Sequence, residues 1–295
     1  APPPAARHRY APAGGERSGM DRSARAADPG SVIFVTPPST PLALNKVGRE
    51  QRAVGGPAAS ARPASERMTG GTNSPYPNLA EDGAELFPGA AAVCLDQLRG
   101  ALHKLPAGRA GVRIHGLAGL QPLLAVEGPI GSLAASILGD QCQPVRAILF
   151  DKTPEANWSL AWHQDRTICV KSKLEVPGYG LWTVKSGMQH VEPPFDLLDR
   201  MLTLRCHLDD VSDENSPLLI APGSHKAGRI PISEYLNVVE KRGIYVCLAQ
   251  AGDIWVYATP ILHASAASDA IGHRRVLQID YSADALGGGL EWLGI

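Results

Sequence analysis

Three segments of the sequence place a histidine two residues before a carboxylate. They are His163-Gln164-Asp165, His190-Val191-Glu192 and His207-Leu208-Asp209. Side chains at positions i and i+2 of a β-strand point to the same face, so an imidazole and a carboxylate with this spacing could hold two neighbouring positions of one metal ion. A histidine from a distant strand would complete the facial triad of non-haem Fe(II) sites. Each segment alone is a weak signal, because chance gives about one such pair among nine histidines.

Single histidines and an arginine pair offer further candidates. His263 follows an apolar run, and His225 follows a Pro-Gly turn signal. A lone histidine in such places more often packs in a core or a loop, so neither is fixed as a third ligand by pattern. Arg274 and Arg275 precede an apolar strand, where a guanidinium could bind a dicarboxylate through paired hydrogen bonds. Strand alternation puts these two arginines on opposite faces and leaves open which of them lines a site.

The elements that must position these residues are mostly short strands. The apolar spacing that includes Val93 predicts a helix over 89–104, and helices are also expected over 128–138 and 234–241. Strands are predicted over 145–150, 180–184, 201–208, 244–248, 253–257 and 276–281, and the stretch 158–170 is expected to contain a strand around His163-Gln164-Asp165. The strand over 201–208 alternates in the manner of a half-buried strand, and Glu192-Pro193-Pro194 indicates a turn. Many short strands favour a β-sandwich or barrel, and no βαβ rhythm or phosphate loop supports a nucleotide fold.

Composition narrows the class of protein. The 295 residues carry 28 Lys and Arg against 29 Asp and Glu, a balance that argues against a nucleic-acid-binding protein. No apolar run is long enough to span a membrane. Residues 1–75 are basic and rich in Ala, Pro, Gly and Ser, so we expect a disordered leader, with a natural start that could lie at Met68, and one domain over 76–295. Five scattered cysteines fit reduced thiols and a cytoplasmic location.

Four stretches, taken in order, resemble the phytanoyl-CoA dioxygenase family of Fe(II)- and 2-oxoglutarate-dependent oxygenases. They are Trp-His-Gln-Asp at 162–165, an acidic loop and Pro-Gly-Ser-His within 204–228, the stretch from Ala-Gly-Asp to His-Ala-Ser over 251–265, and His-Arg-Arg to Tyr-Ser-Ala over 273–283. The combination is specific, and the resemblance covers residues 80–283. It implies a mainly β fold, a double-stranded β-helix or cupin-like jelly roll with a few flanking α-helices.

The resemblance also implies roles for individual residues. The catalytic metal ligands would be His163, Asp165 and His263. Arg274 matches the arginine that binds the C5 carboxylate of 2-oxoglutarate, with Arg275 as the alternative, and Ser265 matches a polar position that helps to hold this carboxylate. The expected cofactors are Fe(II), 2-oxoglutarate as co-substrate and O2. The implied reaction is hydroxylation of a small organic substrate with release of succinate and CO2.

Some features separate this sequence from alternatives. The loop over 215–217 reads Asn-Ser-Pro where the family usually shows Asn-Gly, so we expect it to differ in detail. An intact Asp165 argues against a halogenase, which has a small residue there. A non-catalytic jelly-roll binding protein and a cupin-like metalloenzyme that does not use 2-oxoglutarate stay open. We expect a small-molecule substrate and neither a nucleic-acid nor a membrane partner, with Gln164, Lys185 and His190 as candidates for the mouth of the site.

Overall fold

Antiparallel strands make up most of the computed structural model, which describes residues 76–106, 109–268 and 272–295. The strands are β1 Ala84–Phe87, β2 Val112–Ile114, β3 Gln143–Lys152, β4 Leu160–His163, β5 Ile168–Val170, β6 Gly180–Lys185, β7 Met188–Glu192, β8 Leu202–His207, β9 Leu218–Ile220, β10 Tyr245–Cys247, β11 Ile254–Ala258, β12 His263–Ser265 and β13 Arg274–Ser282. They form a six-stranded sheet (β1-β11-β8-β13-β3-β2), a four-stranded sheet (β10-β9-β12-β4) and a three-stranded sheet (β5-β7-β6).

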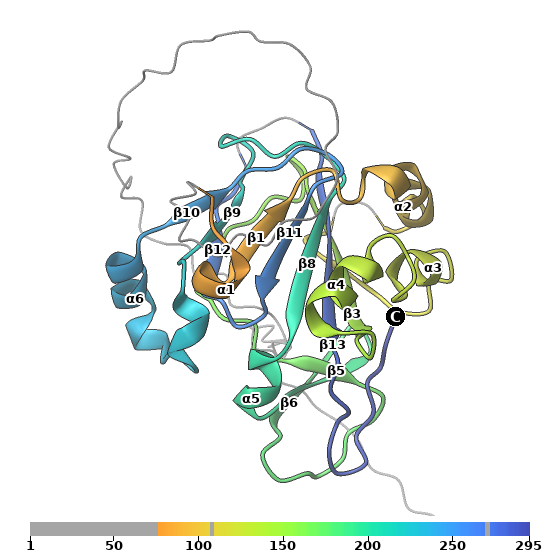
Figure 1. The fold of residues 1–295 in the computed structure, drawn as a ribbon, viewed down its shortest axis with the longest axis vertical. Helices are drawn as coiled ribbons and strands as arrows, with labels where there is room; N and C mark the ends of the chain where they lie inside the picture. Colours follow the sequence, from red (N-terminus) through yellow and green to blue (C-terminus); the bar gives the residue numbers. More distant parts are fainter. Residues whose placement is uncertain (1–75, 107–108, 269–271) are drawn as a thin grey trace, which may run out of the picture. The chain divides into compact units, whose positions relative to one another are not determined.

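Short helices flank the six-stranded sheet. The helices are α1 Leu79–Asp82, α2 Leu95–Leu102, α3 Gln121–Leu124, α4 Gly131–Leu138, α5 Phe195–Asp199 and α6 Tyr235–Arg242. Figure 1 shows α2, α3 and α4 on one side of the six-stranded sheet, and β9, β10 and β12 on the other. The prediction of a mainly β fold with a few flanking helices is therefore confirmed.

The two faces of the six-stranded sheet have different partners. On the outer face, apolar side chains such as Leu204 and Ile279 pack against Leu98 and Ile130 of the helical layer. Burial of each such side chain stabilises the fold by about 1.5–3 kcal/mol. On the inner face, Trp255 packs with residues of the four-stranded sheet. Strand residues that do not face the helices therefore lie in the interior between the two sheets.

The inner face of β8 is polar and buried. The sequence predicts a half-buried strand here, but all six residues of β8 are buried. Thr203, Arg205 and His207 point away from the apolar cluster that Leu204 and Cys206 join. The prediction of a solvated face is wrong because the four-stranded sheet covers this side. Buried polar groups need partners, so their position marks the interior as a place for chemistry.

The strand predicted within 158–170 is broken at the His-Gln-Asp segment. Strand β4 ends at His163, and β5 begins at Ile168. Between them the buried Gln164 side chain donates hydrogen bonds to the backbone oxygens of Gly228 (3.0 Å) and Pro260 (2.8 Å). These tertiary bonds hold the chain in a corner, so Asp165 lies beyond the end of the strand. The expectation that His163 and Asp165 share one strand face is wrong in this respect.

Other expectations met mixed outcomes. The turn expected over 192–194 begins one residue later, because Glu192 is the last residue of strand β7. Val93 is 83% exposed, because a 3-10 turn over Ala92–Cys94 precedes α2 and resets the helical register.

All five cysteines are free and buried. Within the described ranges, no helix has the length and apolar character needed to cross a membrane. The predicted leader over 1–75 and the possible start at Met68 lie outside the described residues, so the domain boundary stays a prediction.

Candidate metal centre

His163 and His263 stand directly opposite each other on β4 and β12. Their ring centroids are 4.2 Å apart, and His263 is buried while His163 is half-buried. Asp165 lies beside them, and one ligand atom from each of the three residues falls within 4.8 Å of the others. Among the described residues, this is the one group of three or more histidines, cysteines and acids with such spacing. The fold therefore brings together the three residues that the sequence singled out.

Hydrogen bonds set the orientation of both imidazoles. His163 Nδ1 lies 2.8 Å from the backbone oxygen of Ala161, and His263 Nδ1 lies 2.9 Å from that of Ile261. A carbonyl oxygen can only accept, so each Nδ1 carries the proton and donates it. Each Nε2 then keeps its lone pair for a metal ion, the usual arrangement of metal-binding histidines. Burial, followed by the charge of His163, lowers the pKa of His263 to about 3, so its ring is neutral.

The Asp165 carboxylate is held by two donors on the opposite sheet. Arg146 Nη2 lies 3.4 Å from Asp165 Oδ2, and Gln278 Nε2 donates to the same oxygen at 3.2 Å. Burial alone would raise the pKa of Asp165, but the charge of Arg146, the nearby imidazoles and the hydrogen bond from Gln278 lower it to about 2. Two neutral imidazoles and one ionised carboxylate are a donor set that suits Fe(II). The residues present therefore fit that metal.

The other two His-x-acid segments do not form such a group. His190 accepts or shares a hydrogen with the Cys169 thiol at 3.0 Å, while Glu192 pairs with Arg229 at 2.5 Å. His207 is buried on the inner face of β8, but Asp209 lies outside this strand and binds Arg275. His225 also lies outside the group of three. In each of these two segments the histidine and the acid have different partners, which the tripeptides do not reveal.

A group of buried cations lies on the inner face of the six-stranded sheet. Arg274 and Lys152 are cross-strand partners on β13 and β3, and both are 2% exposed. Arg274 Nη2 donates to the backbone oxygen of Ser216 at 2.6 Å, and Lys152 Nζ donates to Ser265 Oγ at 2.8 Å. Arg275 instead forms a two-bond ion pair with Asp209. Of the two arginines, Arg274 is the one that faces the interior.

Several polar atoms of this group have no partner. Ten buried side-chain nitrogen or oxygen atoms of the described residues lack a hydrogen bond, and half of them belong to Arg205, His207, Ser216 and Arg274. Burial and the charges of Arg274 and Arg205 lower the pKa of Lys152 to about 7. Burial and the charge of Arg205 also lower the pKa of Arg274. Unpaired buried cations are costly, which indicates that an anion belongs among them.

Gln278 connects this cationic group to the three candidate ligands. Its Nε2 donates to Asp165, and its Oε1 accepts from Arg205 Nη1 at 3.0 Å and from the hydroxyl of Tyr257 at 3.3 Å. One side chain therefore spans the distance between the carboxylate and the cations. Sequence reasoning missed Lys152, Arg205 and Gln278. The available signal was Lys152, a lysine two residues beyond the apolar run over 145–150.

A family model for phytanoyl-CoA dioxygenase (PhyH) matches residues 125–276. This match spans more than half of the chain and contains the three candidate ligands and Arg274. The chain belongs to the phytanoyl-CoA dioxygenase family. Members of this family are non-haem iron oxygenases that depend on 2-oxoglutarate, so Fe(II), 2-oxoglutarate and O2 are its cofactors.

Solved structures agree with the fold of this phytanoyl-CoA dioxygenase family member. Apo EctD from S. alaskensis is 20% identical with a TM-score of 0.51, over 74% of this chain and 78% of that one. An EctD structure with bound Fe gives 20% and 0.50 over the same shares. AviO1 from Streptomyces viridochromogenes Tue57 is 19% identical with a TM-score of 0.50, over 71% and 94%. No curated protein matches the chain. These likenesses confirm the predicted cupin-like jelly roll.

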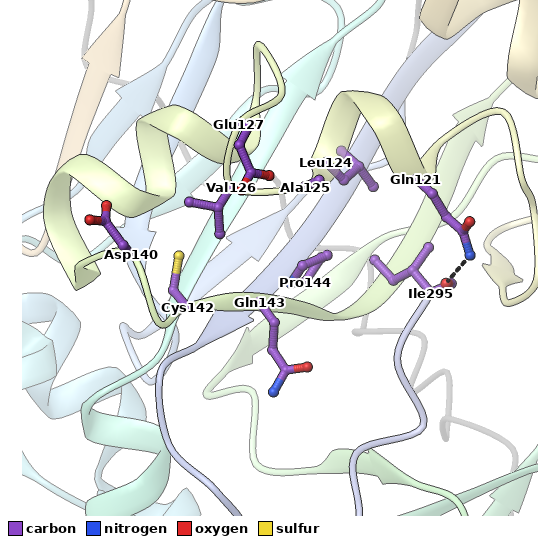
Figure 2. Close-up of a pocket in the computed structure, with 10 residues that line it drawn as sticks. All are labelled: Gln121, Leu124, Ala125, Val126, Glu127, Asp140, Cys142, Gln143, Pro144 and Ile295. Atoms are coloured by element: carbon purple, nitrogen blue, oxygen red, sulfur yellow. Dashed lines mark hydrogen bonds between the residues drawn. The ribbon is translucent and has the colours of Figure 1, made fainter.

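A surface hollow of about 370 Å³ lies elsewhere on the molecule. Figure 2 shows it between the α3 and α4 region, the start of β3 and the C-terminal Ile295, whose oxygen accepts a hydrogen bond from Gln121 Nε2 at 3.3 Å. Its lining shares no residue with the candidate metal centre or the cationic group. The hollow is therefore separate from the residues that carry the family's chemistry.

Proposed function

We propose that this protein hydroxylates a small organic substrate at an iron centre held by His163, Asp165 and His263. The buried cations Arg274 and Lys152 bind the C5 carboxylate of 2-oxoglutarate, with Ser265 Oγ beside them. The bound iron, with 2-oxoglutarate and O2, supplies the oxidising power, and 2-oxoglutarate leaves as succinate and CO2. The C–H bond that is hydroxylated lies on the side of the iron centre where His163 is half-buried.

The observation that carries this proposal is the link made by Gln278. An iron ligand set and a separate pocket of unpaired cations are what 2-oxoglutarate requires, since one end of this molecule chelates metal and the other is a free carboxylate. Gln278 bonds to Asp165 on one side and to Arg205 on the other. The two halves of the site are therefore joined by one side chain, which reaches from the six-stranded sheet to Asp165 beyond the end of β4.

The residues of the chain have distinct tasks in this reaction. The Nδ1–H groups of His163 and His263 donate to backbone oxygens, so both Nε2 atoms point toward the iron position before metal binds. Arg146 and Gln278 hold Asp165 Oδ2, which fixes the orientation of the carboxylate. Such preorganisation lowers the cost of assembling the site.

The cations orient the co-substrate. Arg274 lies opposite Lys152 across the strand pair, so a carboxylate between them receives charge-assisted hydrogen bonds from both sides. The unpaired Nε of Arg274 and the single N–H of the neutral His207 ring are further donors that an incoming anion can satisfy. Because these groups are buried, water competes weakly for them, and each interaction gains strength from the low dielectric.

Anaerobic titration of the metal-free protein with Fe(II) and then 2-oxoglutarate tests this function. We expect the weak visible charge-transfer band of a keto acid chelated to Fe(II). His163→Ala should abolish this band, and Arg274→Ala should shift its half-saturation to higher 2-oxoglutarate concentration. If Fe(II) binds but no band forms, the 2-oxoglutarate role is wrong, and a cupin-like metalloenzyme or a binding protein becomes the better interpretation.

Hydroxylation needs its own measurement. Under ¹⁸O2, a substrate found by screening should gain one labelled oxygen atom, while succinate gains the other. Formation of succinate without labelled product would contradict hydroxylation and indicate another oxidative outcome, such as desaturation or epimerisation. The band described above would be unchanged in that case, so the two failures can be told apart.

A further inference from the structure

Arg113 and Lys185 form a second group of cations, within electrostatic range of Asp165. Arg113 is on β2, where it pairs in register with Ile148 of β3. Its neighbours Val112 and Ile114 face the helical layer, so Arg113 is on the inner face of the six-stranded sheet. Lys185 ends β6 of the three-stranded sheet, opposite Met188 of β7. The two cations thus come from different sheets.

Lys185 and Arg113 both lie within electrostatic range of His190 and Cys169. On the three-stranded sheet, Thr183 lies opposite His190, and His190 lies opposite Cys169. The charge of Arg113 acts on His190, Cys169 and Lys185, and the charge of Lys185 acts on the same His190 and Cys169. Burial is the main reason that the pKa of His190 falls to about 4, so this ring is neutral. His190 therefore adds no negative charge beside the two cations.

Neither cation has a partner. In residues 76–106, 109–268 and 272–295, the side chains of Arg113 and Lys185 form no hydrogen bond and no ion pair. Arg113 Nε and Thr183 Oγ1 are buried and unsatisfied. Burial, then the charges of Arg113 and Arg146, lower the pKa of Lys185. Like charges that crowd together in a half-buried place indicate a missing anion.

The charges already assigned do not supply that anion. Arg146 is neutralised by its ion pair with Asp280 at 2.5 Å. Asp165 is within electrostatic range of Arg113 and Lys185, but it is the proposed iron ligand. In the proposed site, Asp165 and the keto-acid end of 2-oxoglutarate balance the charge of Fe(II), and the C5 carboxylate is paired with Arg274 and Lys152. No anion of the proposed site is then left for Arg113 and Lys185.

We propose that the substrate of this oxygenase is an organic anion, and that Arg113 and Lys185 bind its carboxylate or phosphate group with Thr183 as a further hydrogen-bond donor. This inference rests on the proposed function, since it takes the iron centre as the place of reaction. An anionic group held here places the rest of the substrate beside Asp165. The charge of Asp165 acts on both cations, so the proposed anchor and the proposed iron ligand share one electrostatic environment.

Binding of matched probes tests the inference. The full-length protein, loaded with redox-inert Zn(II) and saturated with 2-oxoglutarate, is titrated with hexanoate, hexyl phosphate and hexanol, and ligand-observed NMR gives each Kd. Saturating 2-oxoglutarate keeps the probes away from Arg274 and Lys152. We expect at least one anion to bind more tightly than hexanol. The preferred anion tells carboxylate from phosphate substrates.

Single substitutions locate the binding. Arg113→Gln and Lys185→Met should each weaken the preferred anion by about tenfold or more, the usual effect of losing one charge-assisted hydrogen bond. Lys241→Met removes an exposed lysine of α6 and should leave every Kd unchanged. Equal affinity for hexanol, absence of anion binding, or unchanged anion affinity in both variants would each overturn the inference.

The charge-transfer band separates this inference from the proposed function. Both variants should form the band with Fe(II) and 2-oxoglutarate, since Arg113 and Lys185 lie outside the proposed co-substrate site, and the band also shows that they are folded. A wild-type protein that forms the band but binds no anionic probe contradicts the inference alone. A wild-type protein that forms no band contradicts the proposed function.

Discussion

Lys152 and Arg274 occupy opposite positions on β3 and β13, and both are buried with no carboxylate bonded to either. Two like charges in one buried place oppose folding. Their retention makes sense when an anion binds between them, because the anion then converts repulsion into two attractive contacts. The pair therefore predicts opposite effects of substitution on stability and on co-substrate binding.

Replacing Lys152 with methionine should stabilise the protein in the absence of 2-oxoglutarate. The pKa of Lys152 is about 7 when folded, below that of an unfolded lysine, so its charge is a full penalty below pH 7. As the pH rises above 7, the folded protein loses the charge on Lys152 and the penalty shrinks. The Tm of the wild type should then approach that of the variant. We expect a Tm several degrees higher for Lys152→Met at pH 6.5, and a smaller gain at pH 9, measured by calorimetry.

The same substitution should weaken the binding of 2-oxoglutarate. Loss of one charged hydrogen bond costs about 1.5–3 kcal/mol, equivalent to a Kd larger by roughly ten- to a hundredfold. A Lys152→Met protein that is more stable yet binds 2-oxoglutarate normally would show that the lysine serves another purpose. Lys241→Met, on the exposed surface of α6, is the control for removal of a positive charge.

Binding of 2-oxoglutarate should depend on pH through Lys152. The protonated lysine is the form that attracts a carboxylate, and its pKa without ligand is about 7. Affinity should therefore be level below pH 7 and fall above it, by at most about tenfold per pH unit, with uptake of a proton on binding. Isothermal titration in buffers of different ionisation enthalpy measures this uptake, which should vanish in Lys152→Met.

Adjacent arginines should respond differently to substitution. Arg274→Met removes a buried cation of the co-substrate site, so the KM for 2-oxoglutarate should rise by roughly tenfold or more. Arg275→Met breaks the ion pair with Asp209 on the other face and should change this KM little. Equal effects of the two substitutions on the KM would contradict the assignment of Arg274 as the anchor.

Removal of the metal should lower the Tm of the protein, and this effect should require the proposed metal ligand His263. A metal that binds the folded state alone stabilises it by about 2.7 kcal/mol at a hundred times its Kd. Chelation of Fe(II) under anaerobic conditions should therefore lower the Tm of the wild type, and His263→Ala should make the Tm insensitive to both metal and chelator. A Tm of His263→Ala that still responds to Fe(II) would place the metal elsewhere.

Arg146 should matter for folding more than surface arginines do. It bonds to Asp280 at 2.5 Å and supports Asp165, so Arg146→Met leaves buried carboxylates without their cation. We expect a loss of about 3–5 kcal/mol in the free energy of unfolding from urea titration. Arg200→Met breaks an exposed pair with Asp284 and should cost about 0–1 kcal/mol. Comparable losses in the two variants would show that the Arg146 network is not strongly coupled.

Sequence reasoning predicted the strands and the ligand candidates better than the environment of the site. Local alternation identified β8 and β13, but it could not tell which face the second sheet covers, so Arg274 and Arg275 stayed undecided. The burial of Lys152 depends on Arg274, which is more than a hundred residues away in the chain. Likewise, Gln164 breaks its strand through bonds to Gly228 and Pro260, which no local pattern encodes. Non-local contacts decide each of these features.

The hydrogen bonds of Gln164 have a consequence for how the scaffold can change. They join the His-Gln-Asp corner to Gly228 and to Pro260, and the amide of Ile230 donates back to Gln164 at 3.0 Å. Three chain segments thus behave as a single tethered frame around the iron position, whether or not the ion is present. The three-stranded sheet that carries Thr183 and Lys185 is outside this frame, so its side chains can be exchanged to admit new substrates while the oxidising centre keeps its shape.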